Sequence, residues 1–245
     1  MGERKLDVAA ADGAAEGFLY APEGEGPWPG LIWYTDVWGI RPANQGMARR
    51  VADAGYAVLM PNIFYRTDRL PIIAGEPDPN DPTTKARMEH LLGALSAEMM
   101  LRDGAAYADF LLRQPEVRGP KLAAVGYCFS GQFALFTAAA APEEIAAAAS
   151  FHGGWLVTEG PGSPHTVLPR VKAELFFAHA SDDPLMPAQD IARFEAALAA
   201  WGGRYESATW PARHGWSVPG RPVYDRAQSE RHFAALLDLL ARTLR

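Results

Sequence analysis

The single cysteine of the chain lies where its sulfur could become a nucleophile. Residues 126–131, Gly-Tyr-Cys-Phe-Ser-Gly, join the apolar run Lys121–Val125 to a helix-like segment. A tight turn from strand to helix holds its central residue above the sheet, and small residues two positions away on each side let it close. Gly126 and Ser130 occupy those positions. We therefore expect Cys128 to be reactive, although most free cysteines are buried apolar side chains.

The same turn would assist the chemistry of Cys128. The thiolate is the reactive form of cysteine, and the N-terminus of a helix favours it. The backbone N–H of Phe129 would be free in the first helical turn, where it could stabilise an oxyanion. Ser130 is a poorer nucleophile candidate, because a turn centred on it would put Cys128 where a glycine is wanted.

A cysteine nucleophile needs a base, and the base needs an orienting group. In folds with such a turn, the order along the chain is nucleophile, acid and histidine. Of the six histidines, His214 alone has this order and lies in a loop after an apolar run. Asp182 and Asp183 both precede it in an earlier loop, so either could orient it. His152 ends the strand that follows the cysteine's helix and could line the pocket.

Apolar runs that alternate with amphipathic segments must position these residues. Strands are expected at Leu31–Tyr34, Tyr56–Met60, Lys121–Val125, Ala146–Phe151, Glu174–His179 and Arg204–Trp210. Helices are expected at Ala43–Ala54, from Thr83 or Thr84 to before Pro115, and at Gly131–Ala141, Ala188–Trp201 and about Asp225–Leu244. This order predicts one α/β domain over residues 1–245, with a mostly parallel sheet and helices on both faces. Ligands bind beyond the carboxyl ends of such strands, where the loops 66–82 and 153–169 are expected.

Composition excludes several classes of protein. The 245 residues are 49% hydrophobic, enough for a large core, and the net charge of −6 argues against nucleic-acid or anionic-membrane partners. One cysteine permits no intramolecular disulfide and no cysteine-based metal site. No secretory signal or membrane-spanning run is visible. We expect a cytoplasmic protein that is a monomer or small homo-oligomer, needs no cofactor or metal, and acts on a small molecule.

Three motifs together resemble the dienelactone hydrolase family of α/β-hydrolases. Gly-Tyr-Cys-x-x-Gly at 126–131 is similar to its nucleophile motif, and Asp-x-x-x-Pro at 183–187 resembles its acid loop. His-Gly-Trp at 214–216, with Tyr-Asp at 224–225 and a final helix, resembles its histidine segment. The resemblance runs from about Leu31 to the C-terminal helix and favours Asp183 over Asp182. It implies an α/β-hydrolase fold that cleaves an ester or lactone with Cys128, His214 and Asp183.

The resemblance also implies a fourth catalytic residue. Family members carry a Glu in a Glu-x-x-Gly segment that contacts the cysteine and is thought to help form the thiolate. The matching segment here is Asp36-Val37-Trp38-Gly39. Asp36 is shorter by one methylene, so its contact with Cys128 would be longer or mediated by water. By the same resemblance, the N–H of Val37 is the second oxyanion donor beside that of Phe129.

The expected substrate differs from that of the family's type enzyme, which binds a carboxylate through arginines. One of those lies four residues after the histidine, a place that Val218 occupies here. Arg66, Arg87 and Arg221 are nearby, but none is a clean match. Large aromatics flank the expected site loops, and they favour a more apolar substrate: Trp38, Phe64, Tyr65, Phe129, Trp155 and Trp216. We expect substrate contacts from Trp38, Arg66, Tyr127, His152 and Trp216.

Two other functions stay open. The first is a broad carboxylesterase or thioesterase, which would use the same three residues. The second is a non-catalytic ligand-binding protein of the same fold, in which the thiol would be inert and no ester would be cleaved. A thiol-redox role is less favoured, because the chain contains no second cysteine to resolve an oxidised Cys128.

Overall fold

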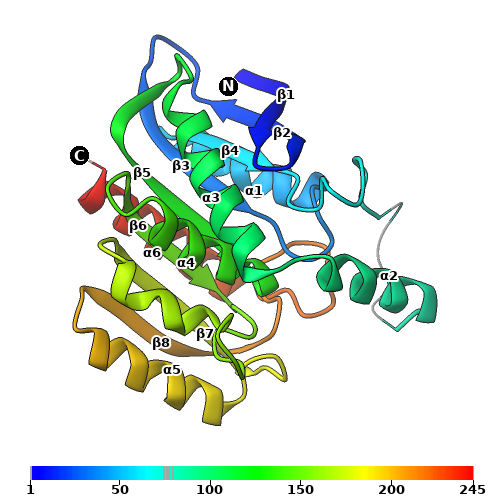
Figure 1. Ribbon diagram of the computed structural model, residues 1–245. Helices are drawn as coiled ribbons and strands as arrows, with labels where there is room; N and C mark the ends of the chain where they lie inside the picture. The colour runs from blue at the N-terminus through cyan, green and yellow to red at the C-terminus, as the bar shows by residue number, and fades with distance from the viewer. Residues whose placement is uncertain (1, 74, 76–77, 79, 245) are drawn as a thin grey trace.

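A mixed but mostly parallel sheet forms the centre of the molecule. The computed structural model describes residues 2–73, 75, 78 and 80–244. Within them the sheet has the strand order β1-β2-β4-β3-β5-β6-β7-β8 (Figure 1). The strands are β1 (Gly2–Ala10), β2 (Gly13–Ala21), β3 (Trp28–Tyr34), β4 (Ala57–Pro61), β5 (Val117–Tyr127), β6 (Ile145–Phe151), β7 (Glu174–Asp182) and β8 (Tyr205–Arg213).

The parallel part of the sheet positions the loops that carry the expected site. β1, β2 and β4 pair antiparallel, whereas the neighbours from β4 to β8 all pair parallel. Parallel strands end at one edge of a sheet. The loops that follow β3, β5, β6, β7 and β8 therefore leave from the same side.

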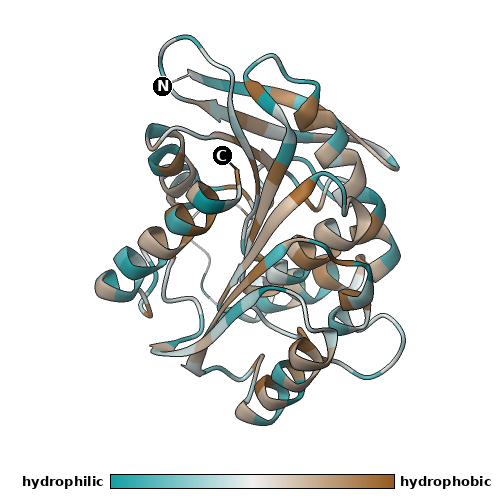
Figure 2. Cartoon of the chain, turned by 90° about the vertical axis from the view of Figure 1, so that its left-hand side faces the viewer, coloured by the Kyte–Doolittle hydropathy of each residue, from teal (hydrophilic) through white to brown (hydrophobic). Residues whose placement is uncertain are grey.

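Helices cover both faces of the sheet, as its apolar strands require. α3 (Ala97–Leu112), α4 (Gly131–Ala140) and α5 (Ala188–Trp201) lie in front of the sheet in Figure 1, and α1 (Pro42–Asp53) and α6 (Arg226–Thr243) lie behind it. Figure 2 shows the sheet between these two layers, and each layer encloses its own apolar cluster. This architecture confirms the expected α/β fold with a mostly parallel sheet.

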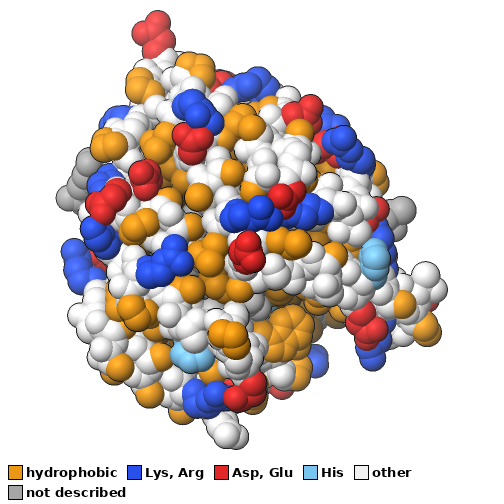
Figure 3. Space-filling view, in the orientation of Figure 1, with side chains coloured by type: hydrophobic (Ala, Val, Ile, Leu, Met, Phe, Trp, Pro, Cys, Tyr) orange, Lys and Arg blue, Asp and Glu red, His pale blue; other side chains and the backbone are white. Residues whose placement is uncertain are grey.

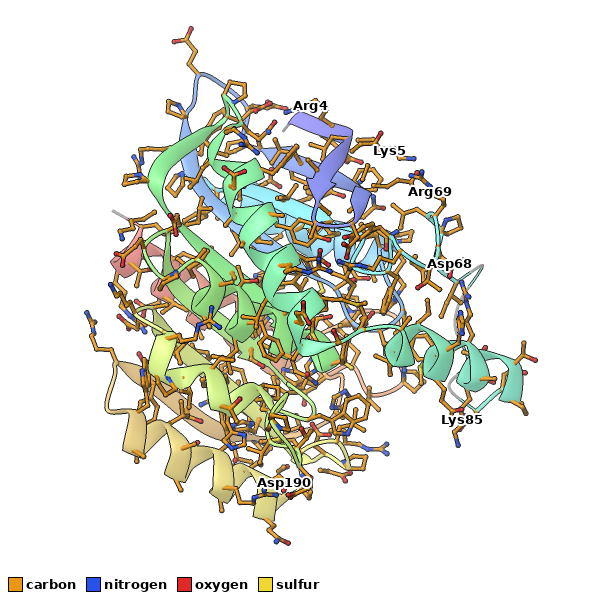
Figure 4. All side chains as sticks on the ribbon, in the orientation of Figure 1. Arg4, Lys5, Asp68, Arg69, Lys85 and Asp190 are labelled. Atoms are coloured by element: carbon orange, nitrogen blue, oxygen red, sulfur yellow. The ribbon has the colours of Figure 1, made fainter. Side chains whose placement is uncertain are left out.

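One helix stands away from the two layers. α2 (Pro82–Gly93) projects to the right in Figure 1, and within it only Leu91 is fully buried. Asp81 caps its first turn by accepting a hydrogen bond of 2.7 Å from the Thr84 N–H. Asp68, labelled in Figure 4, forms an ion pair of 2.5 Å with Arg87 of α2. Of the expected loop 66–82, residues 74, 76, 77 and 79 lie outside the described residues.

The structure corrects the expectation of one long helix before Pro115. Two helices occupy that stretch: α2 ends at Gly93, and α3 begins at Ala97. The side chain of Ser96 accepts a hydrogen bond of 3.2 Å from the Met99 N–H, which caps the second helix. Gly93 and Ser96 were the signals in the sequence, because glycine weakens a helix interior and serine favours a helix start.

The hairpin of β1 and β2 was not expected from the sequence. Its strands are joined by Ala11 and Asp12, and Gly13 follows with a φ of 141° that side chains rarely adopt. An Asp-Gly pair between two strand-like runs is a known hairpin signal. It was obscured because Val8 is the one fully buried residue among the nine of β1, so the strand shows no alternating apolar pattern.

Charges are distributed rather than gathered into one patch on the face seen in Figure 3. Acidic and basic side chains are intermixed there. Within the part of the chain that the structure describes, every helix is too short or too polar to cross a bilayer.

Candidate active site

The turn that carries Cys128 is fixed by its own sequence. Cys128–Ser130 form a short 3₁₀ helix between β5 and α4, and Cys128 has a φ of 57°. A Cβ atom at Gly126 would lie 1.9 Å from the Ser130 carbonyl oxygen, a clash that no side chain could relieve. Glycine at 126 is therefore a condition for the turn to close.

Backbone hydrogen bonds hold Cys128 on both sides. Its N–H donates to Nδ1 of His152 at 3.1 Å, and its carbonyl oxygen accepts from the Gly154 N–H at 3.2 Å. Both partners lie in the loop that follows β6. Cys128 keeps 9% of its surface exposed.

His214 and Asp183 reach Cys128 from two other loops. Nε2 of His214, in the loop after β8, is 3.1 Å from Cys128 Sγ, and its Nδ1 is 2.7 Å from Oδ2 of Asp183. The second oxygen of Asp183 accepts a hydrogen bond of 2.8 Å from the Leu185 N–H. Asp182 is exposed instead and pairs with Arg213 at 3.3 Å. The structure thus brings Asp183, and not Asp182, to the histidine.

The charges around His214 favour its protonated form. Burial opposes the imidazolium, but the Cys128 sulfur and the Asp183 carboxylate outweigh it and raise the pKa of His214 to about 10. A histidine so placed can hold a proton next to a thiolate near neutral pH. The arrangement therefore places a proton-bearing imidazole beside the Cys128 sulfur.

Asp36 has different partners from those that the family resemblance implied. It follows β3, and its carboxylate accepts hydrogen bonds from Arg41 at 2.6 Å and from the Trp38 N–H at 3.2 Å. The Asp36 and Arg41 side chains are only 6% and 11% exposed. Among the described residues, Cys128 makes no hydrogen bond with Asp36. The sequence did not indicate a role for Arg41, because its contact with Asp36 depends on where helix α1 begins.

The two expected oxyanion donors lie in two different loops. Val37 lies next to Asp36 in the loop after β3, and Phe129 follows Cys128 in the turn. Outside the hydrogen bonds within helices and strands, neither backbone N–H donates to the backbone of another described residue.

Three of the expected substrate contacts are buried in the protein instead. Tyr127 and Trp216 have no exposed surface, nor does His152. The Tyr127 hydroxyl is 2.7 Å from Nε2 of His232, and the Trp216 ring packs against the His152 ring. Contrary to the sequence-based expectation, these side chains support the turn from within rather than line a cavity.

Arg66 and Trp38 also have partners of their own. The guanidinium of Arg66 donates to Asp12 at 2.8 Å and to both oxygens of Asp103 at 2.6 and 2.8 Å. Contrary to expectation, its nitrogens thus serve an internal ion cluster. Trp38 is 6% exposed and lies under the guanidinium of Arg221, 5.0 Å from the ring centre.

Open space and an exposed aromatic ring lie at the rim of the site. A cavity of about 570 Å³ adjoins His214 and Asp183 and is also lined by Arg213 and Val223. Among the described residues, Trp155 is the one large hydrophobic side chain that is exposed. The centre of its ring lies 6.4 Å from that of the Phe129 ring, edge to face. No group of three His, Cys, Asp or Glu side chains among the described residues is arranged to hold a metal ion.

Comparison with known proteins gives a consistent result. The model of the dienelactone hydrolase family matches residues 15–244. A Synechocystis sp. protein provisionally named a carboxymethylenebutenolidase is 24% identical over 213 residues, which cover 85% of this chain and 84% of that protein. A Rhodococcus opacus protein named carboxymethylenebutenolidase is 28% identical over 169 residues, 69% of this chain and 58% of that one.

Solved structures show the same fold. A Klebsiella pneumoniae protein provisionally described as a dienelactone hydrolase superposes with a TM-score of 0.86 at 18% sequence identity. The superposition covers 98% of each chain. Nearly the whole chain therefore shares its fold with that protein.

Proposed function

Because the chain belongs to the dienelactone hydrolase family and is a hydrolase of ester or lactone bonds, we propose that Cys128, His214 and Asp183 carry out its reaction. One observation supports this assignment above others. The side chains form a continuous relay, 3.1 Å from Sγ to Nε2 and 2.7 Å from Nδ1 to Oδ2. Nucleophile, base and orienting acid are thus in hydrogen-bond reach of one another.

In the first half of the reaction, the Cys128 thiolate attacks the carbonyl carbon of the substrate. The carbonyl electron pair moves onto oxygen, where the N–H groups of Val37 and Phe129 hold the negative charge. One such donor contributes about 3–4 kcal/mol. The tetrahedral intermediate collapses to a thioester as the carbon–oxygen bond breaks. His214 gives its Nε2 proton to the leaving alkoxide.

In the second half, His214 changes from acid to base. The sulfur is now neutral, so one of the charges that raised the pKa of His214 is lost while burial still opposes the imidazolium. Nε2 can then accept a proton from a water molecule that attacks the thioester carbonyl. Collapse of this second intermediate expels the thiolate and releases the acid. The proton left on His214 restores the original ion pair.

The substrate is proposed to be more apolar than the acidic dienelactone. Trp155 offers an exposed ring beside Phe129, close to the nucleophile turn. An aryl or alkyl group of the ester can bury apolar surface against it. Arg66 cannot clamp a substrate carboxylate without leaving Asp103, which has no exposed side-chain surface. A broad carboxylesterase acting on such esters uses the same residues.

Asp36 is proposed to shape the oxyanion loop rather than to touch the sulfur. Its carboxylate binds both the Trp38 N–H and Arg41, and Val37 lies between Asp36 and Trp38 in the sequence. The loop is thereby held in one conformation. The N–H of Val37 then needs little reorganisation when the oxyanion forms.

Replacement of Cys128 by Ala tests the assignment. We expect hydrolysis of a para-nitrophenyl ester to fall by about 10³-fold or more. The matched control is Ser130→Ala in the same turn, because the buried Ser130 hydroxyl has no hydrogen-bond partner among the described residues. This control should keep its activity. Undiminished hydrolysis by the Cys128→Ala protein would refute the proposal.

A panel of lactones, aryl esters and thioesters would define the substrate class. Stoichiometric reaction of Cys128 with iodoacetamide, slowed by a substrate analogue, is the expected accompaniment. A thiol that stays inert near neutral pH, together with no hydrolysis of any panel member, would instead indicate a ligand-binding protein.

A further inference from the structure

The loop after β6 shares an unusual backbone feature with the nucleophile turn. Among the described residues other than glycine, φ is positive at Cys128 (57°), His152 (41°) and Trp155 (52°). Side chains disfavour this region, so surrounding contacts must hold each residue there. The three residues lie together, because Cys128 bonds to His152 and to Gly154, the neighbour of Trp155. Strained backbone often marks a functional position.

His152 connects the nucleophile turn to the histidine loop. Its Nδ1 is 3.1 Å from the backbone nitrogen of Cys128, and its Nε2 is 2.8 Å from the hydroxyl of Ser217. Its own N–H donates to the Ala178 carbonyl of β7 at 2.8 Å. Ser217 follows His214 by three residues. One imidazole therefore joins the backbone of the nucleophile to the segment that carries its base.

These contacts fix the tautomer of His152. A backbone N–H can only donate, so Nδ1 must be the unprotonated acceptor. The proton then lies on Nε2 and points to the Ser217 oxygen. A protonated ring would have to donate from Nδ1 as well, which would place two donors face to face. Only the neutral ring satisfies both contacts.

The surroundings of His152 keep it neutral. Burial, with further contributions from His214, His232 and Arg221, lowers the pKa of His152 well below its ordinary value. Its ring lies edge to face against that of His214, with 5.2 Å between the ring centres. The ring of His214 thus packs against an uncharged imidazole.

We propose that His152 is a positioning residue for this reaction: by bonding the Cys128 N–H through Nδ1 and Ser217 through Nε2, it fixes the distance between the sulfur and His214. This inference rests on the proposed triad, because it assigns the support of that triad. His152 never touches the substrate. Its use of the Cys128 N–H also leaves the oxyanion to the N–H of the next residue, Phe129.

Two substitutions separate the two bonds of His152. Asn places its amide near the position of Nδ1, so His152→Asn keeps an acceptor for the Cys128 N–H but cannot reach Ser217. Asn also tolerates a positive φ. Gln places its amide near the position of Nε2, so His152→Gln can reach Ser217 but leaves the Cys128 N–H unpaired. His152→Leu loses both bonds.

We expect kcat to fall in the order wild type, His152→Asn, His152→Gln and His152→Leu, with KM nearly constant. A single lost hydrogen bond typically corresponds to a fall on the order of tenfold. The kcat values of His152→Gln and His152→Leu should be lower than that of the wild type by at least this factor. Alkylation of Cys128 by iodoacetamide should slow in the same order. Ser217→Ala should lower kcat without changing the fraction of folded protein.

His179→Gln is the matched control. His179 is also a buried histidine, 1% exposed, and its Nε2 is 3.3 Å from a serine hydroxyl, that of Ser207. Among the described residues, no hydrogen bond joins it to the triad. Rates are compared per folded protein, with circular dichroism and thermal unfolding measured for each variant. His179→Gln should keep the wild-type kcat.

Wild-type kcat and alkylation rates in folded His152→Gln and His152→Leu would overturn the inference, as would a change in KM alone. Equal losses in His179→Gln would overturn it too, because they would indicate a general effect of emptying a buried site. If Cys128→Ala stays active, the proposed triad itself fails. If Cys128→Ala is inactive and the His152 variants are normal, only the role of His152 fails.

Discussion

The replacement Asp183→Asn examines the electrostatic basis of the site. Asp183 and Cys128 raise the pKa of His214 from its ordinary 6.5 to about 10 against the effect of burial. At 1.36 kcal/mol for each pH unit, this difference corresponds to about 5 kcal/mol in favour of the imidazolium. Asn removes one of the two charges. Its NH₂ group can also donate to Nδ1, which leaves the proton on Nε2 and prevents that atom from accepting another.

We expect kcat of Asp183→Asn to fall on the order of 10³–10⁴-fold, with KM little changed, because the wrong tautomer of the histidine faces the sulfur. The sign of the pH dependence follows from the raised pKa. In the wild type, His214 keeps its proton until the pH approaches about 10, so the Cys128 sulfur has a cationic partner throughout the neutral range. In the variant, this partner loses its charge at a lower pH.

Steady-state hydrolysis of a para-nitrophenyl ester and the pH dependence of alkylation by iodoacetamide measure the two effects. The variant should react slowly near neutral pH and approach the wild-type rate only above about pH 8.5, where an unassisted thiol ionises. Asp182→Asn is the matched control, because Asp182 is adjacent, exposed and paired with Arg213. Wild-type kinetics in Asp183→Asn, or equal losses in both variants, would refute the reasoning.

Three further changes test the supports of the site. Arg41→Met should destabilise the fold by about 3–5 kcal/mol in urea unfolding, because Asp36 would keep an unpaired buried charge. The double variant with Asp36→Asn should recover part of this loss, and no recovery would contradict the pairing. Gly126→Ala should lower kcat about 100-fold or more, since its Cβ would lie 1.9 Å from the Ser130 carbonyl oxygen; normal kinetics would show that the turn can relax. Burial lowers the pKa of His179 to about 4, so stability should be full above about pH 6.5 and fall by about 3 kcal/mol as the pH falls through 4. His179→Gln should weaken this acid dependence, and an unchanged curve would show that other groups cause it.

Much of the fold could be predicted because its signals are local. Short apolar runs between amphipathic segments indicated the parallel strands and most of the helices. The break between α2 and α3 was missed, because Gly93 and the Ser96 cap are weak signals inside a helical pattern. The edge hairpin was missed as well, since β1 is mostly exposed and lacks a clear alternation.

The roles of the aromatic and basic side chains were harder to predict. Residue type suggested that Tyr127, Trp216 and Arg66 contact the substrate. In the structure, Tyr127 and Trp216 are buried within the core, and Arg66 binds Asp12 and Asp103. Large aromatic and arginine side chains are common in cores and ion clusters, so only their surroundings can separate packing from binding.

The sequence by itself determined the turn at Cys128, because a clash within six consecutive residues requires Gly126. It also determined the order of nucleophile, acid and histidine along the chain. Only the tertiary structure decided that Arg41, rather than Cys128, binds Asp36, and that His152 joins the nucleophile to the histidine loop. These contacts join segments that meet only once the sheet has formed. Their distances depend on side-chain packing, which the spacing of residues along the sequence does not determine.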